Sequence, residues 1–305
     1  MSLQAVNRSV LGPKSALAAG IALMLAGCLA FSLNDTLGKW LVSTYSVGQL
    51  LLIRSAAALA VLAPFIRREG WAAFARMPHP KLQLLRVALS SLEVGLFYWV
   101  VVYLPLADVV TFYLAGPIFV TALSPFLLGE TIGWKRAGAV VAGFAGVVIA
   151  MRPSTASVSW PALIALAGSL LFALLMIVTR AVRGTTDTVL VTTQMAATMA
   201  LGLVTAPFGW VTPGGRDFAL LALLGIVAMF AHVCVNRSLR LAPASLVVPY
   251  QYTLILWAMI FGYLVFGDAP GLLLVLGAAI IVAAGVFIFE RESAAGESEV
   301  LPPAA

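Results

Sequence analysis

Apolar residues in this sequence come in long runs, separated by short stretches that hold much of the proline and charge. A helix that crosses the hydrocarbon core of a bilayer needs about 20 mostly apolar residues. The runs are about twice as long as the alternating segments of a membrane β-barrel, so they favour helices. The pattern predicts an all-α polytopic membrane protein. Ten transmembrane helices are expected, over residues 15–38, 46–66, 82–103, 107–128, 133–151, 160–181, 187–208, 217–239, 245–266 and 270–289.

The composition supports this interpretation and excludes several classes of protein. Of the 305 residues, 62% are apolar and 10% are charged, whereas soluble domains have about 45–50% and about 25%. A soluble enzyme could not bury so much apolar surface, and a disordered chain would be more polar. The net charge of +6 is not gathered into one patch, so no nucleic-acid partner is expected. Cys28 and Cys234 lie in separate spans, and no motif indicates a metal, a cofactor or a catalytic residue.

The basic residues predict an orientation in the membrane. An even number of spans puts both termini on one side, and Lys and Arg accumulate in cytoplasmic loops. If the termini are cytoplasmic, the inner segments hold fourteen basic residues and the outer side holds only Lys39, Arg152 and Arg216. The remaining one, Arg54, lies inside a span. Both termini are therefore expected in the cytoplasm.

The two halves of the chain resemble each other. Gly129-Glu130 corresponds to Gly267-Asp268, and the segment 146–149 corresponds to 285–288 at a similar offset. Five spans per half is an odd number, so the second half would be inserted upside down. Such inverted repeats are typical of alternating-access transporters, which bind substrate near the bilayer midplane. The expected organisation is a cytoplasmic segment 1–14, a first repeat 15–154, a second repeat 155–290 and a disordered cytoplasmic tail 291–305.

These features resemble a known group of membrane proteins. Ten spans, two inverted halves and the Gly-Glu and Gly-Asp pairs are similar to the drug/metabolite transporter superfamily, EamA type. The segments 104–130 and 241–268 carry most of the likeness, although Asp268 stands where the family commonly has Glu. Within the superfamily the chain looks most like the aromatic amino-acid exporter branch. The resemblance implies export of aromatic and other neutral amino acids and related metabolites across a bacterial inner membrane.

Arg54 and Glu93 are the most informative ionisable residues. A charge at mid-bilayer costs at least ~2.5–3.5 kcal/mol, so such a group is a candidate functional residue. At 1.5 Å per residue, Arg54 would lie roughly 12 Å and Glu93 roughly 15 Å from the outer side. Two interpretations remain open. The residues could form a structural ion pair between neighbouring spans, or they could bind the carboxylate and the ammonium group of a zwitterion.

Other polar residues in the spans have simpler interpretations. Asp35 and Lys39 are four residues apart near the outer end of the first span, which predicts a pair within one helix. His232 and Asn236 share one face of the eighth span, where they could contact a ligand or be buried structural residues. Gln194 is expected to join two helices by hydrogen bonds.

Aromatic residues and prolines predict the walls of a cavity. Pro117 has no N–H, so the carbonyl of Tyr113 loses its helical partner, and Pro249 acts similarly in the matching span. Aromatic rings with a polar tip suit an aromatic or cationic ligand, although Trp and Tyr also form belts at the membrane surface. The two prolines are candidate gating positions. The candidate substrate-binding residues are Arg54, Glu93, Tyr98, Trp99, Tyr113, His232, Asn236, Tyr250, Gln251, Tyr252 and Trp257.

The leading hypothesis is a secondary transporter that works as a monomer by alternating access around a midplane cavity. The first alternative is an exporter of cationic drugs or metabolites, with Glu93 alone as the cation partner. A membrane-embedded enzyme acting on lipid would need a cluster of His and carboxylates near one face, which the sequence lacks. A channel would need a continuous polar stripe or a ring of like charge, whereas the polar groups in these spans are isolated.

Overall fold

The computed structural model describes residues 13–104, 106–129, 133–151 and 160–267, together with a few positions between 272 and 283. Residues 1–12 and 291–305 lie outside the described part, as does most of the predicted span 270–289.

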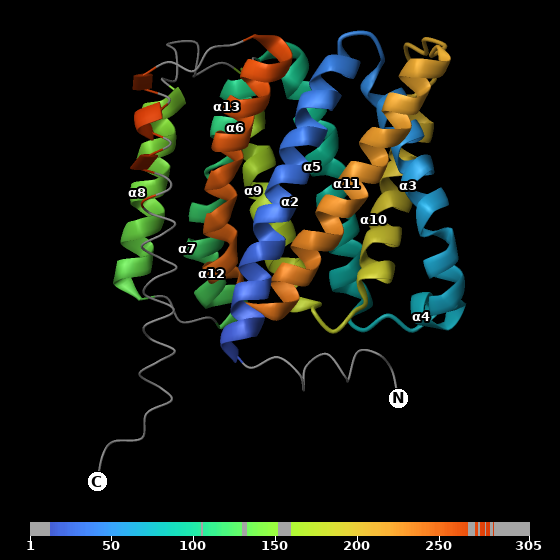
Figure 1. Ribbon diagram of the computed structural model, residues 1–305. Coiled ribbons are helices and arrows are strands. Elements are labelled where there is room, and N and C mark those ends of the chain that lie inside the picture. Colours follow the sequence, from blue (N-terminus) through green and yellow to red (C-terminus); the bar gives the residue numbers. More distant parts are fainter. Residues whose placement is uncertain are drawn as a thin grey trace.

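Every regular element in the described part is helical (Figure 1). Seven of these helical segments are long and apolar enough to cross a membrane, and they agree with seven of the predicted spans. The elements are α2 (Pro13–Val42), α3 (Val47–Glu69), α4 (Trp71–Ala75), α5 (Pro80–Tyr103), α6 (Leu106–Tyr113), α7 (Gly116–Leu128), α8 (Trp134–Met151), α9 (Trp160–Ala181), α10 (Asp187–Thr205), α11 (Gly215–Leu241), α12 (Ala244–Val247), the 3-10 helix η2 (Val248–Thr253), α13 (Leu254–Phe261) and the π-helix η3 (Gly262–Phe266).

Two predicted spans are broken helices. The span predicted over 107–128 consists of α6 and α7, joined by a turn at Leu114 and Ala115. Pro117 is near the start of α7, so the carbonyl of Tyr113 has no helical N–H partner. The hydroxyl of Ser169, on α9, donates to that carbonyl at 3.1 Å. The span predicted over 245–266 consists of α12, η2, α13 and η3, with Pro249 near the start of η2.

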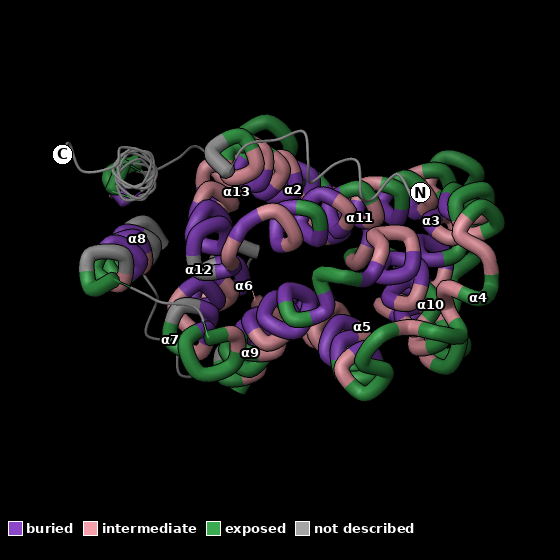
Figure 2. Tube along the Cα trace, turned by 90° about the horizontal axis from the view of Figure 1, so that it is seen from below, coloured by how far each residue is buried: buried purple, intermediate pink, exposed green. Residues whose placement is uncertain are grey.

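The long helices pack in pairs that join distant parts of the chain. α2 packs along α11, α3 along α10 and α5 along α9. Figure 2 shows these helices end-on, with their buried sides facing one another, while α8 stands at one edge. Glycines allow the closest approaches: a Cβ added at Gly225 on α11 would lie 1.8 Å from the backbone oxygen of Arg54 on α3. A Cβ at Gly202 on α10 would lie 2.5 Å from the backbone nitrogen of Leu52.

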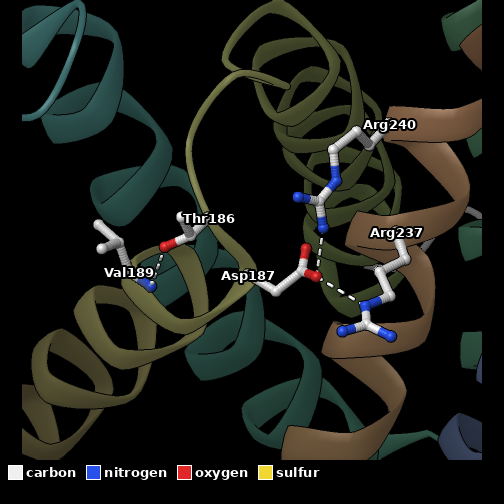
Figure 3. A network of polar contacts seen from close by, with 5 residues as sticks. All are labelled: Thr186, Asp187, Val189, Arg237 and Arg240. Carbon is white, nitrogen blue, oxygen red and sulfur yellow. Dashed lines mark hydrogen bonds and ion pairs between the residues drawn. The ribbon is translucent and has the colours of Figure 1, made fainter. Parts of the chain in front are cut away.

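Basic residues gather at the end of the bundle where α2 begins and α3, α9 and α11 end (Figure 1). Asp187, in the first turn of α10, accepts from Arg237 Nε at 2.7 Å and from Arg240 Nη2 (Figure 3). At the start of the same helix, the Thr186 side chain accepts from the backbone N–H of Val189. This end is the one predicted to be cytoplasmic, and that orientation stays a prediction.

The opposite end is held by hydrogen bonds around the starts of α3 and α11. The side-chain amide of Gln49 donates to the carbonyl of Val211 at 2.5 Å and accepts from its N–H at 3.0 Å. The Tyr45 hydroxyl donates to Asp217 at 2.6 Å. These bonds tie the start of α3 to the segment that leads into α11.

Candidate functional site

A cavity lies among the helices and is walled by both halves of the chain. Its volume is about 90 Å³, below the roughly 300–1,000 Å³ of typical ligand pockets. A bound metabolite would therefore require the helices to move apart. Its lining includes Phe31, Ser32, Asn34, Asp35 and Thr36 from α2, Arg54 from α3, Glu93, Val94, Phe97 and Tyr98 from α5, Val110 and Tyr113 from α6, Leu114, Phe172 from α9, His232 from α11, Gln251 from η2, and Leu254 and Ala258 from α13.

The Tyr98 hydroxyl is the centre of the polar wall. It accepts from Arg54 Nη1 at 3.0 Å and from Asn34 Nδ2 at 3.0 Å. The Tyr98 ring lies against Gly38 of α2, where a Cβ would be 2.6 Å from Cε1. The Arg54 guanidinium lies 5.5 Å from the centre of the same ring, within the range of a cation–π contact. Tyr98 thus joins α2, α3 and α5 at the cavity.

Two buried polar atoms in this wall have no hydrogen-bond partner among the residues that the structure describes. Arg54 is 2% exposed and its Nε is unpaired, and Asn34 is 4% exposed and its Oδ1 is unpaired. Buried donors and acceptors are nearly always satisfied in folded proteins. One unused donor and one unused acceptor therefore belong to residues that line the cavity.

Arg54 and Glu93 line the same cavity, but they do not form an ion pair with each other in the described part of the chain. The partner of the Arg54 guanidinium is the Tyr98 hydroxyl. Of the two open interpretations, the direct structural ion pair is not observed. Both charges instead face one space.

The predicted pair of Asp35 with Lys39 was wrong. Asp35 lines the cavity and accepts from Asn34 Nδ2 at 3.2 Å. Lys39 Nζ lies 5.5 Å from the ring centre of Phe266. Asp35 is the candidate site residue that the sequence interpretation missed. The signal was present, because a carboxylate inside a span is costly and marks a functional position.

Aromatic rings form the apolar wall. Phe97 packs edge-on against Tyr98 and Tyr113, with ring centres 5.3 and 5.2 Å apart, and Tyr113 lies 6.4 Å from Phe172. Trp99, predicted in the cavity, does not line it. Its side chain is 42% exposed and packs with Tyr103 and Trp160 on the outer surface. This arrangement fits the alternative interpretation of an aromatic belt.

The candidate substrate-binding residues in the second half of the chain also divide into those that line the cavity and those that do not. His232 and Gln251 line the cavity, whereas Asn236, Tyr250, Tyr252 and Trp257 do not appear in its wall. The Tyr252 hydroxyl donates to the carbonyl of Val140 at 3.1 Å, so this side chain points towards α8. Asn236 is buried along α11, and Tyr250 and Trp257 belong to the apolar core between α2, α9 and α11. Tyr250, Gln251 and Tyr252 are successive residues of the 3-10 helix η2, which has three residues per turn. Their side chains therefore point about 120° apart, and only Gln251 of the three lines the cavity.

The EamA-like transporter family model matches residues 18–152 and again residues 159–290. The chain belongs to the EamA-like transporter family. This EamA protein is therefore an integral membrane transporter, with a family unit in each half.

Curated EamA relatives are similar to it over most of their length. A riboflavin transporter of Rhizobium johnstonii is 28% identical over 92% of this chain and 93% of its own. An S-adenosylmethionine uptake transporter of Rickettsia prowazekii is 27% identical over 90% and 93%. A pseudopaline exporter of Pseudomonas aeruginosa is 25% identical over 88% and 95%. These names differ from the predicted aromatic amino-acid exporter branch, which is not shown.

One solved crystal structure shares the fold. It is 18% identical, covers 89% of this chain and 94% of its own, and superposes with a TM-score of 0.70. At this identity the likeness concerns the fold alone.

Proposed function

We propose that this EamA protein is a secondary transporter that binds its substrate in the cavity and opens it alternately to the two sides of the membrane. In this proposal ten spans form two inverted five-helix repeats, 15–154 and 155–290. The helix pairs support it. The first helix of one half packs on the third of the other, as α2 on α11 and α5 on α9, and the second helices, α3 and α10, pack on each other. Exchanging the halves leaves this pattern unchanged, as a two-fold axis between repeats requires.

The charges in the cavity indicate the chemistry of the substrate. One guanidinium, Arg54, faces a space shared with two carboxylates, Asp35 and Glu93. A ligand with one negative and two positive groups complements this set, and the aromatic wall adds contacts for a flat ring. We infer an amino-acid-type metabolite with a ring system and an additional positive charge. S-adenosylmethionine, which names one relative, has all of these groups.

The carrying observation is that Arg54, whose buried Nε has no partner among the described residues, lines the same cavity as the two carboxylates. A carboxylate of the substrate would satisfy this donor. Aromatic amino acids are the second candidate, because they offer one carboxylate, one ammonium group and a ring. A simple cation is disfavoured by Arg54. Riboflavin is uncharged, so it would leave the charges of the cavity without partners.

Transport by purified protein in liposomes tests this proposal. The probes are labelled S-adenosylmethionine, tryptophan, arginine and riboflavin, each with and without a pH gradient. We expect saturable uptake of S-adenosylmethionine that is accelerated by the same unlabelled compound inside, with tryptophan as a competitor. Measurement in both directions tests the predicted export. Absence of flux above that of empty liposomes for all probes, or flux that does not saturate, would overturn the proposal.

Substitutions at the charges test the cavity itself. Arg54→Gln should weaken binding of S-adenosylmethionine about 10- to 100-fold, because a charge-assisted hydrogen bond is worth about 1.5–3 kcal/mol. Asp35→Asn should weaken S-adenosylmethionine more than tryptophan, which has one positive group fewer. Arg216→Gln and Glu69→Gln are matched controls outside the cavity and should leave both affinities unchanged. Equal effects at cavity and control positions would contradict the assignment.

The monomer, the ten spans and the cytoplasmic termini also remain proposals. Reporter domains fused to each end measure the orientation, and both should report the cytoplasm.

A further inference from the structure

Arg86 is a buried cation that the proposed transport cycle does not use. It lies in α5, is 1% exposed, and its guanidinium donates from three nitrogens. Nε donates to Thr179 Oγ1 at 3.1 Å, Nη1 to the carbonyl of Leu190 at 2.9 Å, and Nη2 to Gln194 Oε1 at 2.9 Å. All three acceptors are neutral. In the described part of the chain, therefore, no carboxylate pairs with this guanidinium.

The contact with Arg86 decides how the Gln194 amide is oriented. A guanidinium has donors only, so the Gln194 atom that faces it must be the oxygen. The NH2 group of Gln194 then faces His232, with its nitrogen 3.0 Å from Nε2 and 3.3 Å from Nδ1 of the ring. Gln194 is 3% exposed and His232 is 9% exposed, so little water can mediate these contacts.

The amide in turn restricts the imidazole. The NH2 group is a donor, so the ring nitrogen that pairs with it must carry no proton. An imidazolium carries a proton on both nitrogens and would set N–H groups against the N–H groups of Gln194. Nε2 is the nearer of the two ring nitrogens, and the tautomer that uses it as the acceptor carries its proton on Nδ1. Phe31 packs edge-on against the ring at 5.0 Å and limits its rotation.

We propose that Arg86 and Gln194 are positioning residues that keep His232 neutral and select its tautomer, so that the ring meets the substrate as an uncharged hydrogen-bond donor. The substrate contact rests on the proposed function. The chain of contacts from Arg86 through Gln194 to His232 is called the relay below. It implies a substrate with a neutral acceptor, such as a carbonyl or hydroxyl oxygen or a ring nitrogen, on the side of the cavity lined by His232. Such an acceptor would be distinct from the carboxylate assigned to Arg54.

The other charges around His232 act in both directions. Arg54 opposes a further positive charge in the cavity, whereas Asp35 and Glu93 favour one. The other charged residues on helices packed against α11 lie towards the ends of the bundle, as Lys39, Arg180 and Asp187 do. Cys28, in the middle of α2, is a buried thiol. Burial of the ring also disfavours the imidazolium, so the relay acts together with burial and with the positive charges of Arg54 and Arg86.

The sequence allows a direct test, because it contains only two histidines, His79 and His232. Full-length protein labelled with 15N-histidine in lipid nanodiscs gives two sets of ring signals, and His79→Gln assigns them. We expect His232 to show the neutral form, with the proton on Nδ1, from about pH 5 to about pH 8. Appearance of its imidazolium signal near pH 6–7, where an ordinary histidine titrates, would overturn the proposal.

Variants of Gln194 give opposite expectations. Gln194→Leu removes the amide donor that opposes the imidazolium, so the imidazolium of His232 should appear at a higher pH than in the wild-type protein. Gln194→Glu offers an acceptor to the ring and should keep the imidazolium to higher pH. Gln83→Leu is the matched control, because Gln83 is a buried amide that bonds to Thr185 outside the relay. Identical titrations in all variants would refute the relay. None of these readouts needs transport, so they are separate from the test of the proposed function.

Discussion

Replacing Tyr98 by phenylalanine removes one oxygen atom from the centre of the cavity wall. The hydroxyl accepts from Arg54 Nη1 and Asn34 Nδ2, and both donors are buried at 2% and 4% exposure. The phenylalanine ring keeps the packing against Gly38 and Phe97. The substitution is therefore expected to act through hydrogen bonding rather than through a cavity.

The magnitude follows from the two donors left without a partner. An unsatisfied buried donor costs about 1–3 kcal/mol, with the higher value for a charged group. Arg54 already has an unpaired Nε, so its loss is at the upper end of that range. Asn34 Nδ2 keeps a second acceptor in Asp35, so its loss is at the lower end. The expected loss in free energy of unfolding is about 3–4 kcal/mol.

Unfolding in mixed detergent micelles measures this difference, with transport in liposomes as a second readout. Tyr103→Phe is the matched control on the same helix, because the Tyr103 side chain is 53% exposed and packs against Trp99 and Trp160. The control should lie within about 0.5 kcal/mol of wild type. A Tyr98→Phe variant as stable as Tyr103→Phe would refute the reasoning that the hydroxyl organises the site.

Three further substitutions follow from the packing. Gly225→Ala places a Cβ 1.8 Å from a backbone oxygen of α3, so it should prevent folding. The measurement is size-exclusion chromatography in detergent, where the monodisperse peak should be lost. Gly262→Ala is the control, because its Cβ meets no atom within 4 Å and the variant should behave as wild type. Ser169→Ala leaves the Tyr113 carbonyl without its donor and should lower the free energy of unfolding by about 1–2 kcal/mol; an unchanged value would mean that water replaces the hydroxyl. Asp187→Asn should destabilise the protein by about 1 kcal/mol at low salt and by less in 1 M salt, and a salt-independent loss would contradict the ion-pair interpretation.

The helices were predictable from the sequence because length and apolarity alone decide whether a segment can span a bilayer. The observed bounds of α9, Trp160–Ala181, match the predicted span 160–181. The breaks at Pro117 and Pro249 were also predictable, since a missing N–H is a local property. The break leaves the carbonyl of Tyr113 without a helical N–H partner, and this carbonyl accepts from the hydroxyl of Ser169 on α9.

The direction in which each side chain points was less predictable. The spacing of Asp35 and Lys39 shows that they share a side of α2. It does not show that Asp35 faces the cavity, because the wall there is formed by Asn34 with Tyr98, which is 64 residues away in the sequence. Trp99 follows Tyr98 on α5, and the step of about 100° between successive residues turns it to the exposed side of the helix. Spacing alone could not show this, because Phe97 and Tyr98 are also successive and both line the cavity.

The bonding of Tyr98 also bears on what the cavity can hold. A tyrosine hydroxyl offers two lone pairs and one proton. Arg54 and Asn34 use both lone pairs, and no acceptor for the proton is found among the described residues. Arg54 also has an unused donor, its Nε, and both residues line the same cavity. A carboxylate of the substrate could accept from the Tyr98 hydroxyl and from Arg54 Nε at once. This argues that Arg54 and Tyr98 together form the anion-binding half of the proposed zwitterion site.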